Sequence, residues 1–263
     1  MTRRSGQTKS KADLVVLDWG IGGLSVYRSL QKTFPWLTMI YFSDSGSIPY
    51  GQLTRRQMAD RLMKVLRRLS KDYGIHRFVI ACNAASTALP DLHSDFKNEG
   101  FEVIGMIEPT ILWLKKNREA VKTTAFIGGR RTVRSGLLQK TGVVGRVAQP
   151  LSALIESGIL DGPELHQNLK VILKPLKKKR QLILACTHYP AISNEIQAHL
   201  PQTKLVDPAE IVVRKISEMW KLKKQTRSYG AATLFLTTGS TAQSRLSAKL
   251  AFQVKAKFIK VSL

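Results

Sequence analysis

The sequence predicts an α/β fold with two similar facing lobes, each a mainly parallel sheet flanked by helices, and the functional site between them. Short apolar runs bounded by Gly, Pro and Asp alternate with longer amphipathic stretches, and this alternation is typical of buried parallel strands joined by helices. Residues 78–83 and 182–187 are near copies, FVIACN and LILACT, which indicates that the second half repeats the plan of the first. In such folds ligands bind at the carboxyl ends of the strands.

The apolar runs give the expected strands, and the stretches between them give the helices. Residues 55–71 place apolar side chains such as Met58, Leu62 and Leu69 at helical spacing. We expect strands, in chain order, at residues 14–18, 38–44, 77–83, 101–106, 123–129, 143–150, 181–188, 204–207, 233–239 and 257–263.

Three segments follow from this order. Residues 1–12 form a basic flexible tail, residues 13–106 and 210–263 form the first α/β lobe, and residues 107–209 form the second. No Gly/Ser linker separates the lobes, so the boundary near residue 107 rests on the repeat alone.

Composition excludes several classes of protein. Of the 263 residues, 43% are hydrophobic and 23% are charged, which rules out disorder, a collagen-like repeat and a disulfide scaffold. The presence of only two cysteines suggests a reducing compartment. The apolar runs are strand-sized, well below the ~20 residues that cross a bilayer, and no signal h-region follows the basic start. We therefore expect a cytoplasmic protein with no membrane partner.

The charge is strongly positive, with 42 Lys and Arg against 18 Asp and Glu, a formal net charge of +24. Such a field favours nucleic acid, anionic lipid or anionic small substrates. The local basic runs at residues 177–180 and 221–224 contain no interleaved aromatic side chains and match no recognisable nucleic-acid module. A solvated basic surface therefore stands beside nucleic-acid binding as an interpretation.

Cys82 and Cys186 occupy equivalent strand ends, 104 residues apart. A thiol at the turn into a helix lies near backbone N–H groups, which favour its thiolate. Inert buried cysteines are one interpretation. A metal site is another, but two cysteines and a histidine placed in this way lack close ligand spacing, so we expect no metal. A site with one sulfur on each face of a small substrate fits the repeat best.

Acid–base side chains stand close to these strand ends. His188 follows Cys186 by two residues and can orient or deprotonate the thiol, unless it is a structural histidine. Asp18 ends the first strand, where a buried carboxylate needs a partner or a task. Glu156 is an isolated acid after an apolar run, a pattern that suits a surface position and a catalytic one equally.

The glycine-rich turn after Asp18 contains Gly20, Gly22 and Gly23. Its spacing does not match the G-x-G-x-x-G fingerprint of dinucleotide sites, so we expect no nicotinamide cofactor. A tight turn that lets a small anion approach backbone amides is the better interpretation.

Six motifs in order, DWGIGGLS, DSGSIPYG, ACNAAS, LIESG, ACTHYP and TTGS, resemble those of the glutamate racemases, within the aspartate/glutamate racemase superfamily. The resemblance runs from about residue 14 to the end of the chain. It implies an isomerase that interconverts L- and D-glutamate without a cofactor, with its active site between two facing lobes. It also implies a supply of D-glutamate for peptidoglycan and a homodimer.

The resemblance also implies roles for individual residues. Cys82 and Cys186 exchange the α-proton from opposite faces of the substrate, Cys82 assisted by Asp18 and Cys186 by His188. Glu156 matches the acid that helps to handle the substrate's amino group and the second cysteine. The substrate-holding positions implied by the match are Trp19, Pro49, Tyr50, Gly51, Asn83, Ala84, Thr132, Ser135 and Thr187.

Three positions depart from the family's pattern: Trp19 stands where Ser is usual, Ala84 where Thr is usual, and Leu138 where an aromatic residue is common. Ala84 has no side-chain donor, and Trp19 offers only its indole N–H. Two alternatives stay open on this ground. One is a racemase for aspartate or another amino acid, and the other is a non-catalytic binding protein that uses its basic surface for nucleic acid.

Overall fold

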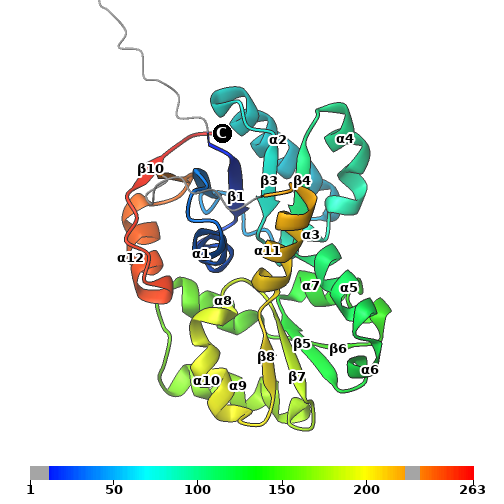
Figure 1. The fold of residues 1–263 in the computed structure, drawn as a ribbon. Coiled ribbons are helices and arrows are strands. Elements are labelled where there is room, and N and C mark those ends of the chain that lie inside the picture. Colours follow the sequence, from blue (N-terminus) through cyan, green and yellow to red (C-terminus); the bar gives the residue numbers. More distant parts are fainter. Residues whose placement is uncertain (1–11, 223–231) are drawn as a thin grey trace, which may run out of the picture.

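The computed structural model describes residues 12–222 and 232–263, which form two parallel sheets flanked by helices (Figure 1). The predicted α/β fold with two facing lobes is confirmed, and all ten expected strands are present. The basic tail predicted at residues 1–12 lies outside the described residues except for Ala12, which is buried. Residues 223–224 of the second basic run also lie outside them.

The second sheet repeats the order of four strands of the first. The first follows β10-β9-β2-β1-β3-β4 and the second β6-β5-β7-β8, so the strand that comes first in each half lies between the second and the third. The first sheet contains β1 (Leu14–Asp18), β2 (Met39–Ser43), β3 (Arg77–Ile80), β4 (Glu102–Gly105), β9 (Thr233–Thr237) and β10 (Phe258–Lys260). The second contains β5 (Thr124–Gly128), β6 (Val144–Val147), β7 (Gln181–Ala185) and β8 (Lys204–Val206).

The helices cover both faces of each sheet. The predicted helix at residues 55–71 is α2 (Arg55–Tyr73), which begins with a capping box of Thr54 and Gln57 and ends at Gly74 in the left-handed conformation. The other α-helices are α1 (Leu24–Thr33), α3 (Asn83–Ser86), α4 (His93–Asn98), α5 (Ile107–Lys116), α6 (Arg118–Val121), α7 (Arg130–Arg134), α8 (Gln149–Glu156), α9 (Pro163–Leu173), α10 (Ser193–His199), α11 (Pro208–Met219) and α12 (Thr241–Phe252). Short 3-10 helices lie at Leu89–Leu92, Gln139–Thr141, Lys174–Leu176 and Tyr189–Ile192.

Alternation along β1 shows how the core is divided. Leu14 and Val16 pack on the face covered by α1, whereas Val15 and Leu17 pack on the face covered by α2. The cluster on the α1 side continues into the second sheet, where it includes Ile127. Helix α11 contacts both β4 and β7. The two lobes are thus joined by a continuous apolar core.

Within the described residues, no helix combines the length and the apolar character that crossing a membrane requires.

Candidate active site

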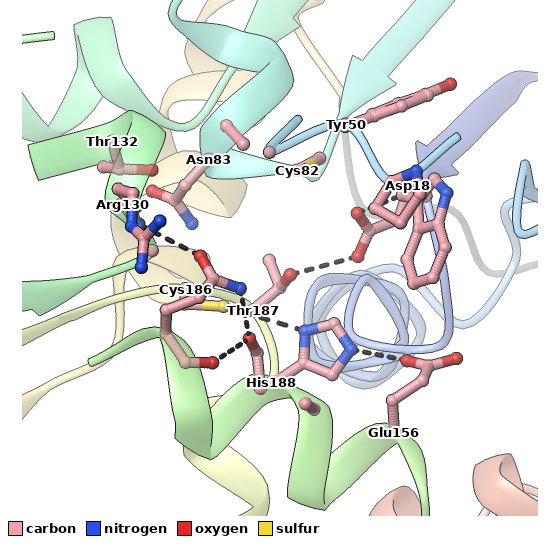
Figure 2. A pocket seen from close by; sticks show the side chains of 18 of the residues that line it. Asp18, Tyr50, Cys82, Asn83, Arg130, Thr132, Glu156, Cys186, Thr187 and His188 are labelled. Atoms are coloured by element: carbon pink, nitrogen blue, oxygen red, sulfur yellow. Dashed lines mark hydrogen bonds and ion pairs between the residues drawn. The ribbon is translucent and has the colours of Figure 1, made fainter. Parts of the chain in front are cut away.

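A cavity of about 510 Å³ lies where the carboxyl ends of the strands of both sheets meet, which is the position expected for a ligand site in such folds. Both lobes contribute to its wall (Figure 2). Among its lining residues are those that the sequence singled out: Asp18, Trp19, Pro49, Tyr50, Gly51, Cys82, Asn83, Ala84, Thr132, Glu156, Cys186, Thr187 and His188.

On the first-lobe side, Cys82 follows β3 and Asp18 ends the neighbouring strand β1. The Asp18 carboxylate is 1% exposed and accepts hydrogen bonds from the Trp19 backbone N–H at 2.7 Å and the Thr187 hydroxyl at 3.0 Å. Burial raises the pKa of Asp18 above its usual range. Burial, and then the charge of Asp18, also raise the pKa of Cys82 well above its usual range. Cys82 therefore holds its proton as a thiol in this state.

On the second-lobe side, His188 lies between Cys186 and Glu156. Its Nδ1 is 3.7 Å from the Cys186 sulfur, and its Nε2 is 2.6 Å from Glu156 Oε2 (Figure 2). Burial acts to lower the pKa of His188, but the hydrogen bonds to Cys186 and Glu156 outweigh it and hold that pKa well above its usual value. The side chain is therefore an imidazolium beside the sulfur.

The glycine-rich turn of the first lobe packs directly against this acid–base pair of the second lobe. A Cβ atom at Gly20 would lie 2.5 Å from Glu156 Oε2, and one at Gly22 would lie 2.5 Å from His188 Nδ1. The backbone N–H of Ile21 donates to Glu156 Oε2 at 3.3 Å. The anion that approaches this turn in the structure is thus a carboxylate of the chain itself.

A buried carboxylate anchors the loop that carries Tyr50 to the cavity. Asp44 accepts two hydrogen bonds from Arg61, at 2.7 and 2.6 Å, one from the Tyr50 hydroxyl at 2.8 Å and one from the Thr238 hydroxyl at 2.9 Å. Burial, together with the charge of Asp44, raises the pKa of Tyr50 well above its usual range. Tyr50 is therefore a neutral donor that holds the loop in place.

Comparison with known proteins agrees with this architecture. The family described as Asp/Glu/Hydantoin racemase matches residues 14–216. The chain belongs to this racemase family. It is 32% identical over 256 residues to a glutamate racemase of Thermus thermophilus, and the match covers 94% of this chain and 95% of that one. It is 30% identical over 247 residues to a glutamate racemase of Carboxydothermus hydrogenoformans, and that match covers 88% of each chain. A solved glutamate racemase of Thermus thermophilus in complex with β-chloro-D-alanine superposes with a TM-score of 0.82 at 30% identity, covering 96% of this chain and 98% of the other.

The three departures from the racemase pattern have different structural settings. The indole N–H of Trp19 donates to the Ser47 carbonyl at 3.1 Å, and the ring packs against the core of the first lobe. Trp19 is thus part of the cavity wall and leaves the cavity open. Ala84 also lines the cavity, whereas Leu138 is fully buried beside Phe126 in the core of the second lobe.

Ser135 has a different position from the one that the racemase motif implied. It is absent from the described cavity wall, and its hydroxyl donates to the Thr132 carbonyl at 2.7 Å. Within the described part of the chain, the His, Cys, Asp and Glu side chains form no group of three that could hold a metal ion.

Eight further residues line the cavity of this racemase-family chain without having been predicted: Gln52, Gly129, Arg130, Gln149, Ser152, Ala153, Ser157 and Ala185. A signal for two of them was present in the sequence. Arg130 follows the end of β5 and Gln149 follows the end of β6, positions that match those of the predicted site residues after β1 and β2. None of the six motifs covers these two strand ends.

Proposed function

We propose that the chain is a cofactor-independent glutamate racemase that interconverts L- and D-glutamate by two-base proton transfer. The observation that carries this proposal is the placement of Cys82 and Cys186 on one cavity, at the ends of β3 and β7, which are equivalent strands in the four-strand order that the two sheets share. The choice of glutamate rests on the relatives that are named glutamate racemases.

The protonated Cys82 thiol suggests the order of events. Cys186, beside the His188 imidazolium, acts as the base that removes the α-proton, and the electron pair of the C–H bond stays on the α-carbon and spreads into the carboxylate. The Cys82 thiol then donates its proton to the opposite face of that carbon and becomes a thiolate. One proton is taken and one is given, so the centre is inverted, and the reverse reaction runs from Cys82 to Cys186. Because the α-proton is a very weak acid, the reaction needs close positioning in a water-excluding cavity.

The remaining residues have supporting roles in this proposal. Asp18 assists Cys82, and Glu156 keeps His188 charged through the 2.6 Å hydrogen bond. We assign substrate holding to the other lining residues that the sequence singled out: Trp19, Pro49, Tyr50, Gly51, Asn83, Ala84, Thr132 and Thr187.

The test is exchange of the α-proton in D₂O, followed by NMR, with L-glutamate, D-glutamate and aspartate offered separately. We expect deuterium to enter glutamate from both enantiomers, and we expect Cys82→Ser and Cys186→Ser each to abolish racemisation. Normal racemisation by both single variants would refute the two-base assignment.

Trp19 and Ala84 favour a second candidate, a racemase with a changed amino-acid substrate. Neither side chain offers the cavity a hydroxyl, and the Trp19 N–H is already used by Ser47. Exchange with aspartate alone would support this candidate. Exchange with no amino acid, together with steeply salt-dependent DNA binding that survives Cys82→Ser, would instead favour a nucleic-acid-binding protein.

In a cell, we propose that the product D-glutamate serves peptidoglycan synthesis in the cytoplasm and that the chain acts as a homodimer. A strain that lacks the protein is then expected to need D-glutamate for growth, and sedimentation is expected to give twice the mass of one chain. We also propose residues 13–106 with 210–263, and residues 107–209, as the two domains.

A further inference from the structure

Arg130 places a permanent positive charge on the cavity wall, and neither the motifs nor the proposed proton transfer use it. Among the described lining residues it is the single arginine, and no lysine accompanies it. Its backbone N–H donates to Gln149 Oε1 at 3.1 Å, and Gln149 Nε2 donates to the Ser152 hydroxyl at 3.1 Å. Two other lining residues thus fix the point from which the guanidinium extends.

Asn83 supplies an independent sign that a ligand binds on this side of the cavity. Its side chain is 4% exposed, and its Nδ2 has no hydrogen-bond partner among the described residues. A buried donor without an acceptor is costly, so such a group indicates an acceptor that a ligand provides. Helices α3 and α7, which begin at Asn83 and Arg130, are in contact.

Figure 2 shows Arg130, Asn83 and Thr132 on one side of the cavity, with Asp18 and Tyr50 on the other. A neutral N–H donor next to a guanidinium suits an anionic oxygen ligand, and a carboxylate offers two such oxygens. The α-carboxylate of the substrate is bonded to the α-carbon, where the two sulfurs exchange the proton. Asn83 directly follows Cys82 in the chain, so its amide lies close to one of these sulfurs. This end of the cavity is therefore the end at which the α-carboxylate would lie.

We propose that Arg130, together with the Asn83 amide, binds the α-carboxylate of the amino-acid substrate. The inference rests on the proposed function for its substrate class. It gives the guanidinium a second effect: as the α-proton leaves, negative charge moves onto this carboxylate, and a cation beside it stabilises that charge.

The test compares Arg130→Gln with Arg134→Gln, a matched control at the other end of the same helix, which is exposed as Arg130 is but lies outside the cavity wall. Titration calorimetry measures the binding of D-glutamate, of D-glutamine, whose distal group is neutral, and of 4-aminobutyrate, which lacks the α-carboxylate. We expect Arg130→Gln to weaken D-glutamate and D-glutamine alike, by about ten- to a hundredfold, and to leave 4-aminobutyrate unchanged. Arg130→Lys is expected to recover part of the loss.

Several outcomes separate this inference from the proposed function. A wild-type chain that racemises glutamate while Arg130→Gln binds both amino acids normally would overturn the inference alone. A loss for D-glutamate but not for D-glutamine would also overturn it, because the guanidinium would then bind the distal carboxylate. A wild-type chain that binds but does not racemise, with binding weakened by Arg130→Gln, would support the inference and refute the function. Failure of the wild type to bind any of the three probes would refute both.

Discussion

The Thr187 hydroxyl of the second lobe donates a 3.0 Å hydrogen bond to the Asp18 carboxylate of the first. The bond joins the residue that follows one cysteine to the acid that lies beside the other. It spans 169 residues of sequence, and both of its partners line the cavity. Because Asp18 is buried, each hydrogen bond that it accepts stabilises its charge in a position where water cannot.

Replacement of Thr187 by Val removes this donor and keeps the shape of the side chain. We expect turnover to fall about ten- to a hundredfold and the free energy of unfolding to fall by about 1–3 kcal/mol, because a buried carboxylate loses a partner. Thr203→Val is a matched control, since that buried hydroxyl donates to the Lys179 carbonyl away from the cavity. If the control lost as much turnover as Thr187→Val, the effect would not belong to Asp18.

Glu156→Gln tests the charge of His188. The raised pKa of His188 means that the imidazolium persists as pH rises, until the pH reaches that raised value. Gln cannot stabilise the positive charge as a carboxylate does, so the pKa of His188 falls. The alkaline limb of the pH profile, where activity declines, is then expected to move to lower pH. The measurement is the pH dependence of kcat for both proteins. His93→Asn, at an exposed position, is expected to leave the profile unchanged, and an unshifted alkaline limb in Glu156→Gln would contradict the assignment.

The same raised pKa affects stability. A histidine whose pKa is higher in the folded state stabilises the fold fully below its unfolded value of 6.5, and this contribution is lost as pH rises through the folded pKa.

Asp44→Asn tests the anchor of the Tyr50 loop. Asp44 is fully buried and pairs with Arg61, so the change is expected to lower the free energy of unfolding by about 3 kcal/mol and to raise KM. Asp72→Asn breaks the exposed pair with Arg68 and is expected to cost less than about 0.5 kcal/mol. Urea unfolding and steady-state kinetics measure both. Equal losses of stability in the two variants would argue against a special role for Asp44.

Asp207 makes the protein's stability depend on pH in the opposite way to most carboxylates. It caps α11 by accepting from the Ala209 N–H at 2.9 Å, and burial raises its pKa from 3.8 to about 6. Since the folded state prefers the protonated acid, stability is lost as pH rises from about 3.8 to 6. Asp207→Asn keeps a capping oxygen without the charge, so we expect a gain of about 1–2 kcal/mol at pH 8 and little change at pH 4. A gain of the same size at both pH values would contradict this account.

Much of the fold could be predicted because the buried strands are short apolar runs with polar ends. Residues 14–18 form a strand with the predicted bounds, whereas the strand predicted at 143–150 covers only Val144–Val147, because Gln149 and Pro150 begin α8. Helix boundaries depend on where backbone groups find partners, which an apolar pattern does not encode. The domain boundaries and the chemical roles of the site residues stay predictions.

The site itself was predictable only in part. The residues at strand ends follow from topology, but the direction of the Trp19 ring depends on a carbonyl of Ser47, 28 residues away. The glycine-rich turn is a similar case. Its lack of side chains was visible, but only the folded chain shows that Glu156 occupies the space that Gly20 leaves. Contacts between lobes are set by packing, and no local pattern specifies them.

The order of strands also has a consequence for synthesis on the ribosome. The second sheet is built from β5 to β8 without interruption, so it can form as soon as residue 206 has emerged. The first sheet cannot be completed then, because β2 pairs with β9 on its outer side and β9 ends at Thr237. Until that point β2 is an open edge with a free row of N–H and C=O groups, ready to pair with another nascent chain. A polysome carrying this message therefore holds a set of incomplete first sheets, and each one is completed only when β9 and β10 have been made.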